Sequence, residues 1–188
     1  MAFTVSTFKS SMAKQSGGAR PALYQIDING GTGVTSSGFS ANENILCKAA
    51  SIPPANIAPL AVNYAGRAYK WNGFRTYDNW TVTVLNDESF SIRNKMMEWM
   101  RVMAGELEGE RTLTHGEQLD GAGGFKDGDA TVTQLSTTGV AMQTYKFHYL
   151  WPTEIAGIPV DWSSDAIQEY TITFAYDYWT HGSVVSAS

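Results

Sequence analysis

A stretch near the C-terminus decides the fold class: residues 168–179 read QEYTITFAYDYW. Large apolar side chains occupy every second position from Tyr170 to Tyr178, and mostly polar residues lie between them. Successive side chains of a β-strand point to opposite faces of a sheet. The alternation therefore predicts a long strand with one buried, aromatic face.

A second aromatic strand is predicted over residues 140–150, directly after a turn at residues 137–139. Residues 131–137 precede the turn, and we expect them to pair with the second strand as a hairpin. The faces of that strand differ in polarity. One face carries Tyr145, Phe147, Tyr149 and Trp151, and the other carries Thr144, Lys146 and His148.

Five further strands are predicted from alternating or β-forming residues. They cover residues 23–28, 45–50, 60–64, 68–71 and 80–85. Hairpin-like connections join about eight strands in all, and one helix interrupts them. We therefore expect a mainly β fold, an antiparallel β-barrel or sandwich flanked by one α-helix.

The helix is predicted at about residues 87–104. Its apolar residues recur at the helical period and form one stripe, which we expect to pack on the open side of a sheet. Asn86, Asp87 and Ser89 are candidate caps at its start, and Gly105 is placed to end it. The predicted helix core comprises Ile92, Met96, Trp99, Met100 and Met103.

The chain is expected to form one domain over residues 21–179. Residues 1–20 are small and polar and predict a flexible N-terminal arm, whereas residues 180–188 predict a C-terminal tail. Two loops interrupt the domain. The first is a Gly/Ser-rich insert at residues 29–44, and the second is an acidic, Gly-rich loop at residues 106–128.

Charge and composition exclude several classes of protein. Lys and Arg number 13 against 18 Asp and Glu, so the chain lacks the basic excess of a protein that binds nucleic acid through phosphates. Charged residues make up only 16%, which suggests that partners hide much of the surface. The single cysteine, Cys47, excludes an internal disulfide and a cysteine-based zinc site. No apolar run approaches the length of a membrane span.

No motif for catalysis or for a cofactor is found. His115, His148 and His181 share no metal-ligand spacing, and the acidic loop lacks the spacing of an EF-hand calcium site. Cys47 lies in an apolar strand, where a buried role is expected. Asp161 and Asp165 are a conceivable acid–base pair, but they lie in a turn-rich stretch where turn capping is the commoner role. We therefore expect no enzymatic activity, no metal and no cofactor.

Several stretches, taken in order, carry a family resemblance. They read RTYDNWTVTVLNDE at residues 75–88, LWPTE at 150–154 with VDW at 160–162, and AYDYW at 175–179. Further agreement comes from ARP at 19–21, CKA at 47–49 with Pro53, and the helix end at 104–105. Together they resemble the major tail tube proteins of contractile-tailed bacteriophages of the T-even type, over residues 19–179. The insert at 29–44 and the tail after Trp179 depart from that pattern.

The resemblance implies a structural subunit of six-fold rings, which stack into a hollow tube for DNA inside a contractile sheath. The implied partners are other copies of the chain, sheath protein, baseplate and tail-terminator proteins. The implied partners within the lumen are the tape-measure protein and DNA, which are held transiently and without sequence specificity. The subunit itself is expected to bind no membrane. Its place is the virion tail, assembled in the host cytoplasm. We also expect the arm and the acidic loop to contact neighbouring subunits or rings.

The lumen in this family is built from two hairpins per subunit, joined between neighbours into one barrel. Polar strand faces are therefore the lumen candidates, and these are Lys48, Thr144, Lys146 and His148, with Lys70 as a further basic residue. We expect a polar or net negative lumen in which acidic residues offset each lysine, because basic stripes would hold DNA. Two other classes stay open: a tube of a bacteriocin or type VI secretion system, and a monomeric ligand-binding β-barrel with a closed apolar cavity.

Overall fold

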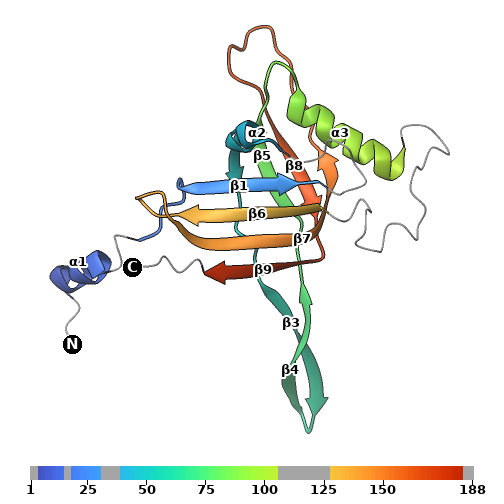
Figure 1. The fold of residues 1–188 in the computed structure, drawn as a ribbon. Coiled ribbons are helices and arrows are strands. Elements are labelled where there is room, and N and C mark those ends of the chain that lie inside the picture. The colour runs from blue at the N-terminus through green and yellow to red at the C-terminus, as the bar shows by residue number, and fades with distance from the viewer. Residues whose placement is uncertain (1–3, 15–17, 31–38, 106–127, 184–188) are drawn as a thin grey trace.

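The computed structural model shows a β-rich body, drawn in Figure 1, with three helices in the described part of the chain. That part comprises residues 4–14, 18–30, 39–105 and 128–183. The elements, in chain order, are α1 (Val5–Lys14), β1 (Tyr24–Asn29), α2 (Ala41–Ile45), β2 (Cys47–Ala50), β3 (Asn56–Tyr64), β4 (Arg67–Thr76), β5 (Trp80–Leu85), α3 (Ser91–Ala104), β6 (Gly128–Leu135), β7 (Ala141–Ile155), β8 (Glu169–Ala175) and β9 (Tyr178–Ser183).

The long strand β7 belongs to two antiparallel sheets. Up to His148 it lies between β6 and β9, and β1 pairs with the far side of β6. From Trp151 onward β7 pairs instead with β8, which is followed by β5 and β2. The body therefore consists of a β1-β6-β7-β9 sheet and a β7-β8-β5-β2 sheet that share one strand, as an antiparallel barrel or sandwich requires.

The core fills the space between the two sheets. Trp80 of β5 stacks on Phe147 of β7 with ring centroids 4.5 Å apart, and Phe174 of β8 lies 5.7 Å from the same indole. Ile26 and Val132 cover them from the other strands, and all five side chains are buried. Burying each such side chain stabilises the fold by about 1.5–3 kcal/mol. The packed rings occupy the interior that a ligand-binding barrel would leave as a cavity.

The irregular backbone at Tyr149 marks the change of sheet within β7. Tyr149 has a φ of 59°, in the left-handed region, and the register with β6 shifts opposite Gly128 and Asp129. Tyr149 is consequently exposed, and Leu150 takes the buried position. The predicted aromatic face is therefore wrong at Tyr149, because a bulge adds one residue and ends the strict alternation.

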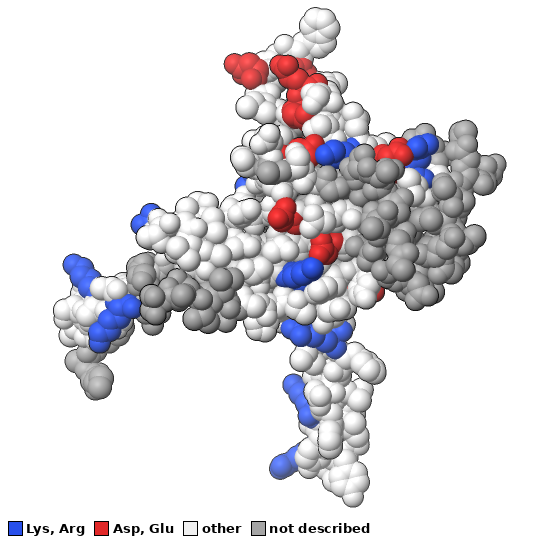
Figure 2. Space-filling model, in the orientation of Figure 1, with Lys and Arg blue, Asp and Glu red and all other residues white. Residues whose placement is uncertain are grey.

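The β3–β4 hairpin forms a two-stranded sheet of its own and projects from the body (Figure 1). Ala65 and Gly66 form its tip with φ of 50° and 76°, the combination that a tight hairpin turn requires. None of its residues is buried, and its charged residues are all basic (Figure 2). A two-stranded hairpin is marginal in water by itself, so this one needs a partner surface.

Two helices and several boundaries differ from the sequence-based expectations. The predicted flexible arm contains α1, whose residues are all exposed. The predicted strand at residues 45–50 starts late, because the Ser40–Glu43 capping box begins α2 and β2 starts only at Cys47. The strands predicted at 60–64 and 68–71 are longer, and the helix predicted from residue 87 begins at Ser91. The single strand predicted at 168–179 is divided into β8 and β9, because the two halves pair with different stretches of β7. β9 continues to Ser183, so residues 180–183 are strand and not the predicted tail.

Parts of four predicted segments lie outside the described residues. They are residues 1–3 and 15–17 of the arm, 31–38 of the insert, 106–127 of the acidic loop and 184–188 of the tail. What was expected of these residues, including their contacts with neighbours, remains a prediction.

Candidate assembly surface

The outer face of the β1-β6-β7-β9 sheet is polar. Residues that lie opposite each other on neighbouring strands point to the same face of the sheet, so their side chains form rows across the strands. Opposite this face, the same strands bury Ile26, Val132 and Phe147 in the core. The outer rows are Gln25–Thr133–Thr144–Gly182, Asp27–Thr131–Lys146–Thr180 and Asn29–Asp129–His148–Tyr178.

Polar contacts order the charged groups of this outer face. Lys146 Nζ lies 2.5 Å from Asp129 Oδ2, and His148 Nε2 lies 2.9 Å from Thr180 Oγ1. Partial burial, together with the nearby Lys146 ammonium, lowers the pKa of His148, although Asp129 opposes this shift. His148 is therefore neutral at pH 7. With Asp27 included, the outer face carries two aspartates and one lysine, a net charge of −1.

The sheet has an open edge along β1 in the described residues. The Leu135 N–H donates to the Leu23 carbonyl at 2.9 Å, so the odd-numbered residues of β1 direct their backbone groups to β6. The backbone groups of Tyr24 and Ile26 consequently point away from the sheet. A groove of about 840 Å³ runs along this edge, between β1 and the α2–β2 segment.

The opposite edge, along β9, follows from the same alternation. Even-numbered residues of β6 face β7, as in the Ala130–Phe147 pair, so the even-numbered residues of β7 face β9. Their partners in β9 are also even-numbered, as in the His148–Tyr178 pair. The backbone groups of Trp179 and His181 therefore point outward. A strand with unpaired backbone groups accepts a strand from another chain.

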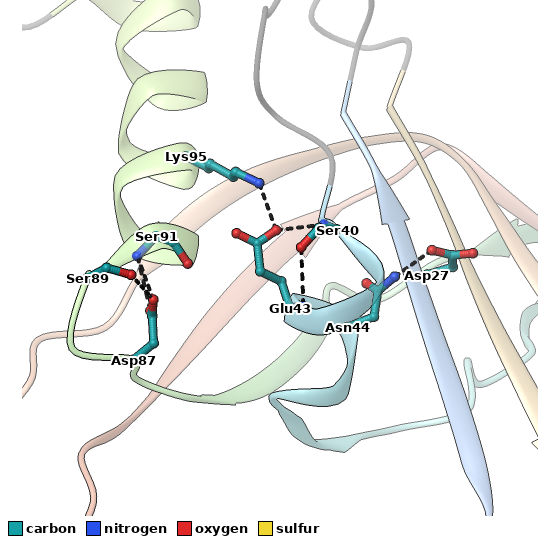
Figure 3. A network of polar contacts seen from close by, with 8 residues as sticks. All are labelled: Asp27, Ser40, Glu43, Asn44, Asp87, Ser89, Ser91 and Lys95. Carbon is teal, nitrogen blue, oxygen red and sulfur yellow. Dashed lines mark hydrogen bonds and ion pairs between the residues drawn. The ribbon is translucent and has the colours of Figure 1, made fainter.

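A polar network holds α2 beside the β1 edge (Figure 3). Lys95 of α3 donates to Glu43 Oε2 at 2.7 Å, and the Ser40 N–H donates to the same oxygen at 2.6 Å. On the other side, Asn44 Nδ2 donates to Asp27 Oδ1 of β1 at 2.6 Å. Burial alone would raise the pKa of Glu43, but the bonds from Lys95 and Ser40 outweigh it and lower the pKa to about 2. Glu43 is thus an anion that fixes α2 to α3.

The start of α3 is held by Asp87, one of the predicted caps (Figure 3). Its carboxylate accepts the Ser91 N–H at 3.0 Å and also the Ser89 hydroxyl. The residue before the helix, Phe90, has a φ of 53° and supplies no side-chain cap. Asp87 therefore satisfies a backbone donor at the helix start that would otherwise have no partner within the helix.

The sequence-predicted lumen residues fall into two groups. Thr144, Lys146 and His148 lie together on the outer face of the β1-β6-β7-β9 sheet. Lys48 lies on β2, in the other sheet, 2.5 Å from Glu169 Oε1, and Lys70 lies on the projecting hairpin. Sequence analysis did not single out Asp27 and Asp129 for this face. The alternation of residues 23–28 indicates that Asp27 lies on the polar side of its strand. The pairing of that strand with β6 was needed to show that Asp27 shares a face with Lys146.

The predicted helix core lies largely inside the molecule. Ile92, Met96, Trp99 and Met103 are buried, whereas Met100 is half-buried and packs at the margin of the core.

The side chains considered above for catalysis, Cys47 and Asp161, have structural roles. Cys47 is buried, and this burial raises the pKa of its thiol to about 12, so it is protonated at neutral pH. Asp161 accepts hydrogen bonds from the Ser163 N–H and hydroxyl at 2.9 and 2.8 Å, as in a turn cap.

Within residues 4–14, 18–30, 39–105 and 128–183, no three metal-ligating side chains cluster. None of the described helices is long and apolar enough to cross a membrane.

Comparison with known proteins identifies relatives over most of the chain. Residues 19–182 match the family model described as phage tail tube protein. Tail tube protein gp19 of Enterobacteria phage T4 is 30% identical over 165 residues, which cover 86% of this chain and 90% of that protein. Tail tube protein gp19 of Enterobacteria phage T6 is 30% identical over 162 residues, with the same coverage.

Solved structures share the fold at low sequence identity. A chain of the anti-feeding prophage baseplate, symmetrised six-fold, has a TM-score of 0.61 and 11% identity, covering 90% of this chain and 98% of that one. A chain of the sheath–tube complex of an extracellular contractile injection system has a TM-score of 0.56 and 13% identity, covering 97% and 100%. The chain therefore belongs to the phage tail tube protein family, and it is a structural tail tube subunit of the contractile, T-even type and a component of the phage virion.

Proposed function

We propose that six copies of the chain join through their β1 and β9 edges into a ring whose inner wall is the polar face of the β1-β6-β7-β9 sheet. The observation that carries this proposal is a sheet that, among the described residues, has two open edges and one polar face. Pairing β9 of one copy with β1 of the next satisfies the outward backbone groups of Trp179 and His181 on one side, and those of Tyr24 and Ile26 on the other. Repetition of this head-to-tail contact closes a ring.

The inner wall of the ring is suited to the passage of DNA. Thr144, Lys146 and His148 face the lumen, and Asp129 neutralises Lys146. A weakly negative, hydroxyl-rich wall gives a polyanion no line of cations to bind, so the duplex slides. Lys48 is left out of the wall, because it lies on the other sheet.

Stacked rings form the tube, and the elements away from the lumen meet its surroundings. The related structures include a sheath–tube complex and a tube-terminating cap, which supports sheath, baseplate and terminator proteins as partners of this chain. Tape-measure protein and then DNA occupy the lumen. The subunit has no catalytic role in this function.

Electron microscopy of the purified protein tests the proposal. We expect rings or tubes with six-fold symmetry, whose subunit contacts bury about 2,000 Å² or more. His181→Pro removes an outward N–H of β9 and is expected to abolish rings while leaving a folded monomer, because proline is tolerated at a strand edge. The matched control, His181→Val, keeps the N–H and should assemble normally. Five-fold rings, or rings formed by both variants, would contradict the proposal.

A further inference from the structure

The β3–β4 hairpin presents an apolar and basic surface that, beyond the hairpin base, no other described segment buries. Large side chains such as Trp71 and Phe74 are 65% and 92% exposed. Arg67, Lys70 and Arg75 are its charged residues, and no Asp or Glu occurs between residues 56 and 76. Exposed apolar surface of this extent on a soluble chain marks an interaction site.

The base of the hairpin is fixed to the β9 side of the body. Trp179 Nε1 of β9 donates to the Pro54 carbonyl at 3.2 Å, and the Arg75 guanidinium lies 4.9 Å over the indole ring of Trp179. The direction in which the hairpin projects is therefore set by the β1-β6-β7-β9 sheet and not by a free hinge.

A surface of opposite charge lies on residues 154–169, here called the acidic segment. It contains four carboxylates and no Lys or Arg. Its exposed apolar side chains include Trp162, which is fully exposed, and Val160 and Ile167. The hydrogen bonds from Ser163 lower the pKa of Asp161, so this carboxylate is charged at neutral pH. The acidic residues are Glu154, Asp161, Asp165 and Glu169, all of them exposed, and Glu169 is already paired with Lys48 of β2.

The two surfaces lie at opposite ends of the molecule. In Figure 1 the hairpin extends below β9, and the connection between β7 and β8, which carries the acidic segment, rises above α2 and β1. Figure 2 shows basic residues on the first end and acidic residues gathered on the second. A hairpin fixed at the β9 side does not reach the acidic segment of its own chain. Complementary surfaces at two ends produce a head-to-tail contact between copies.

We propose that the β3–β4 hairpin of one copy docks on the acidic segment of a second copy, Arg67 and Lys70 against its carboxylates and Trp71 and Phe74 against its exposed apolar side chains. This contact rests on the proposed function, because the β9–β1 pairing of the ring sets the direction in which the hairpin points. When β9 of one copy meets β1 of the next, the hairpin of the first copy points toward the end of the second that carries the acidic segment. The charges select the partner surface, and the apolar side chains supply the buried area.

Charge reversal on each side tests the contact. The hairpin variant carries Arg67→Glu and Lys70→Glu, and the segment variant carries Asp161→Lys and Asp165→Lys. All four residues are exposed, so both variants should remain folded monomers by circular dichroism. Each variant alone opposes like charges, and its critical concentration for assembly should rise more than about tenfold. Asp161→Asn, which keeps the turn cap, is the control for damage to the segment itself.

Mixing the two variants gives the decisive readout. The acidic hairpin of the first variant fits the basic segment of the second, and the basic hairpin of the second fits the acidic segment of the first. An equimolar mixture should therefore assemble into rings of alternating copies. Normal assembly of each variant alone would overturn the inference and leave the edge-paired ring intact. Loss of assembly without recovery in the mixture would also overturn it, since the two surfaces then have other partners. Absence of rings from the wild-type protein would instead refute the proposed function.

Discussion

The indole of Trp99, at the centre of α3, lies directly against the backbone of Gly128, the first residue of β6. A Cβ placed on Gly128 would lie 2.7 Å from Trp99 Cη2 and 2.4 Å from the Leu150 carbonyl oxygen. Trp99 itself has no exposed surface. The helix thus packs onto the point where β6 and β7 shift register, and glycine provides the space for this contact.

Gly128→Ala is expected to destabilise the fold by about 1–3 kcal/mol, because the Leu150 carbonyl belongs to the backbone and cannot move aside like a side chain. Chemical denaturation with fluorescence detection measures the change. Gly157→Ala is the matched control, since a Cβ there meets no atom within 4 Å. Equal stability of the two variants would show that Gly128 does not lie this close to the Leu150 carbonyl and the Trp99 indole.

Trp99→Ala should cost about 3–5 kcal/mol, because it removes a fully buried aromatic side chain and leaves a cavity. Met97→Ala on the same helix removes a side chain that is 46% exposed, and its cost should be well below that of Trp99→Ala. Thermal melting of both variants measures the difference. A Trp99→Ala protein that melts and assembles like the wild type would contradict a core role for this helix.

Glu43 links stability to pH. Its pKa in the folded protein is about 2, below the ordinary value of 4.5, so its stabilising contribution is present above pH 4.5 and is lost as the pH falls toward 2. Glu43→Gln should therefore lower the free energy of unfolding by about 1–3 kcal/mol at pH 7, and the gap to the wild type should narrow by pH 3. Urea titrations at the two pH values measure this. The exposed Glu98→Gln is the control and should change little.

Assembled wild-type tubes should not retain duplex DNA in a gel-shift assay at low salt, because the outer sheet face carries no excess of cations. Thr131→Lys with Thr133→Lys adds two cations per subunit to that face, and these tubes should bind DNA in a salt-sensitive manner. Thr131→Ser with Thr133→Ser is the neutral control. Tight, salt-sensitive binding by the wild type would overturn the assignment of this face to the lumen.

The sequence determined the local elements wherever one periodic pattern persisted. Residues 168–179 alternate without interruption, and β8 lies within them, although the structure divides the stretch and begins β9 at Tyr178. The apolar stripe around Trp99 predicted α3, because burying one face of a helix is its main source of stability. Tyr149 shows where such reasoning stops: a bulge depends on the partner strand, which local periodicity does not contain.

What only the tertiary structure decided is which residues share a surface. Asp27 and Asp129 are far apart in the chain, and their place on one face with Lys146 depends on antiparallel pairing between distant strands. The same pairing placed Lys48 in the other sheet, although its own strand pattern had made it a lumen candidate. The opposite charges of the hairpin and the acidic segment are plain in the sequence. Their position at opposite ends of the body results from long-range packing, which fixes directions that no local pattern encodes.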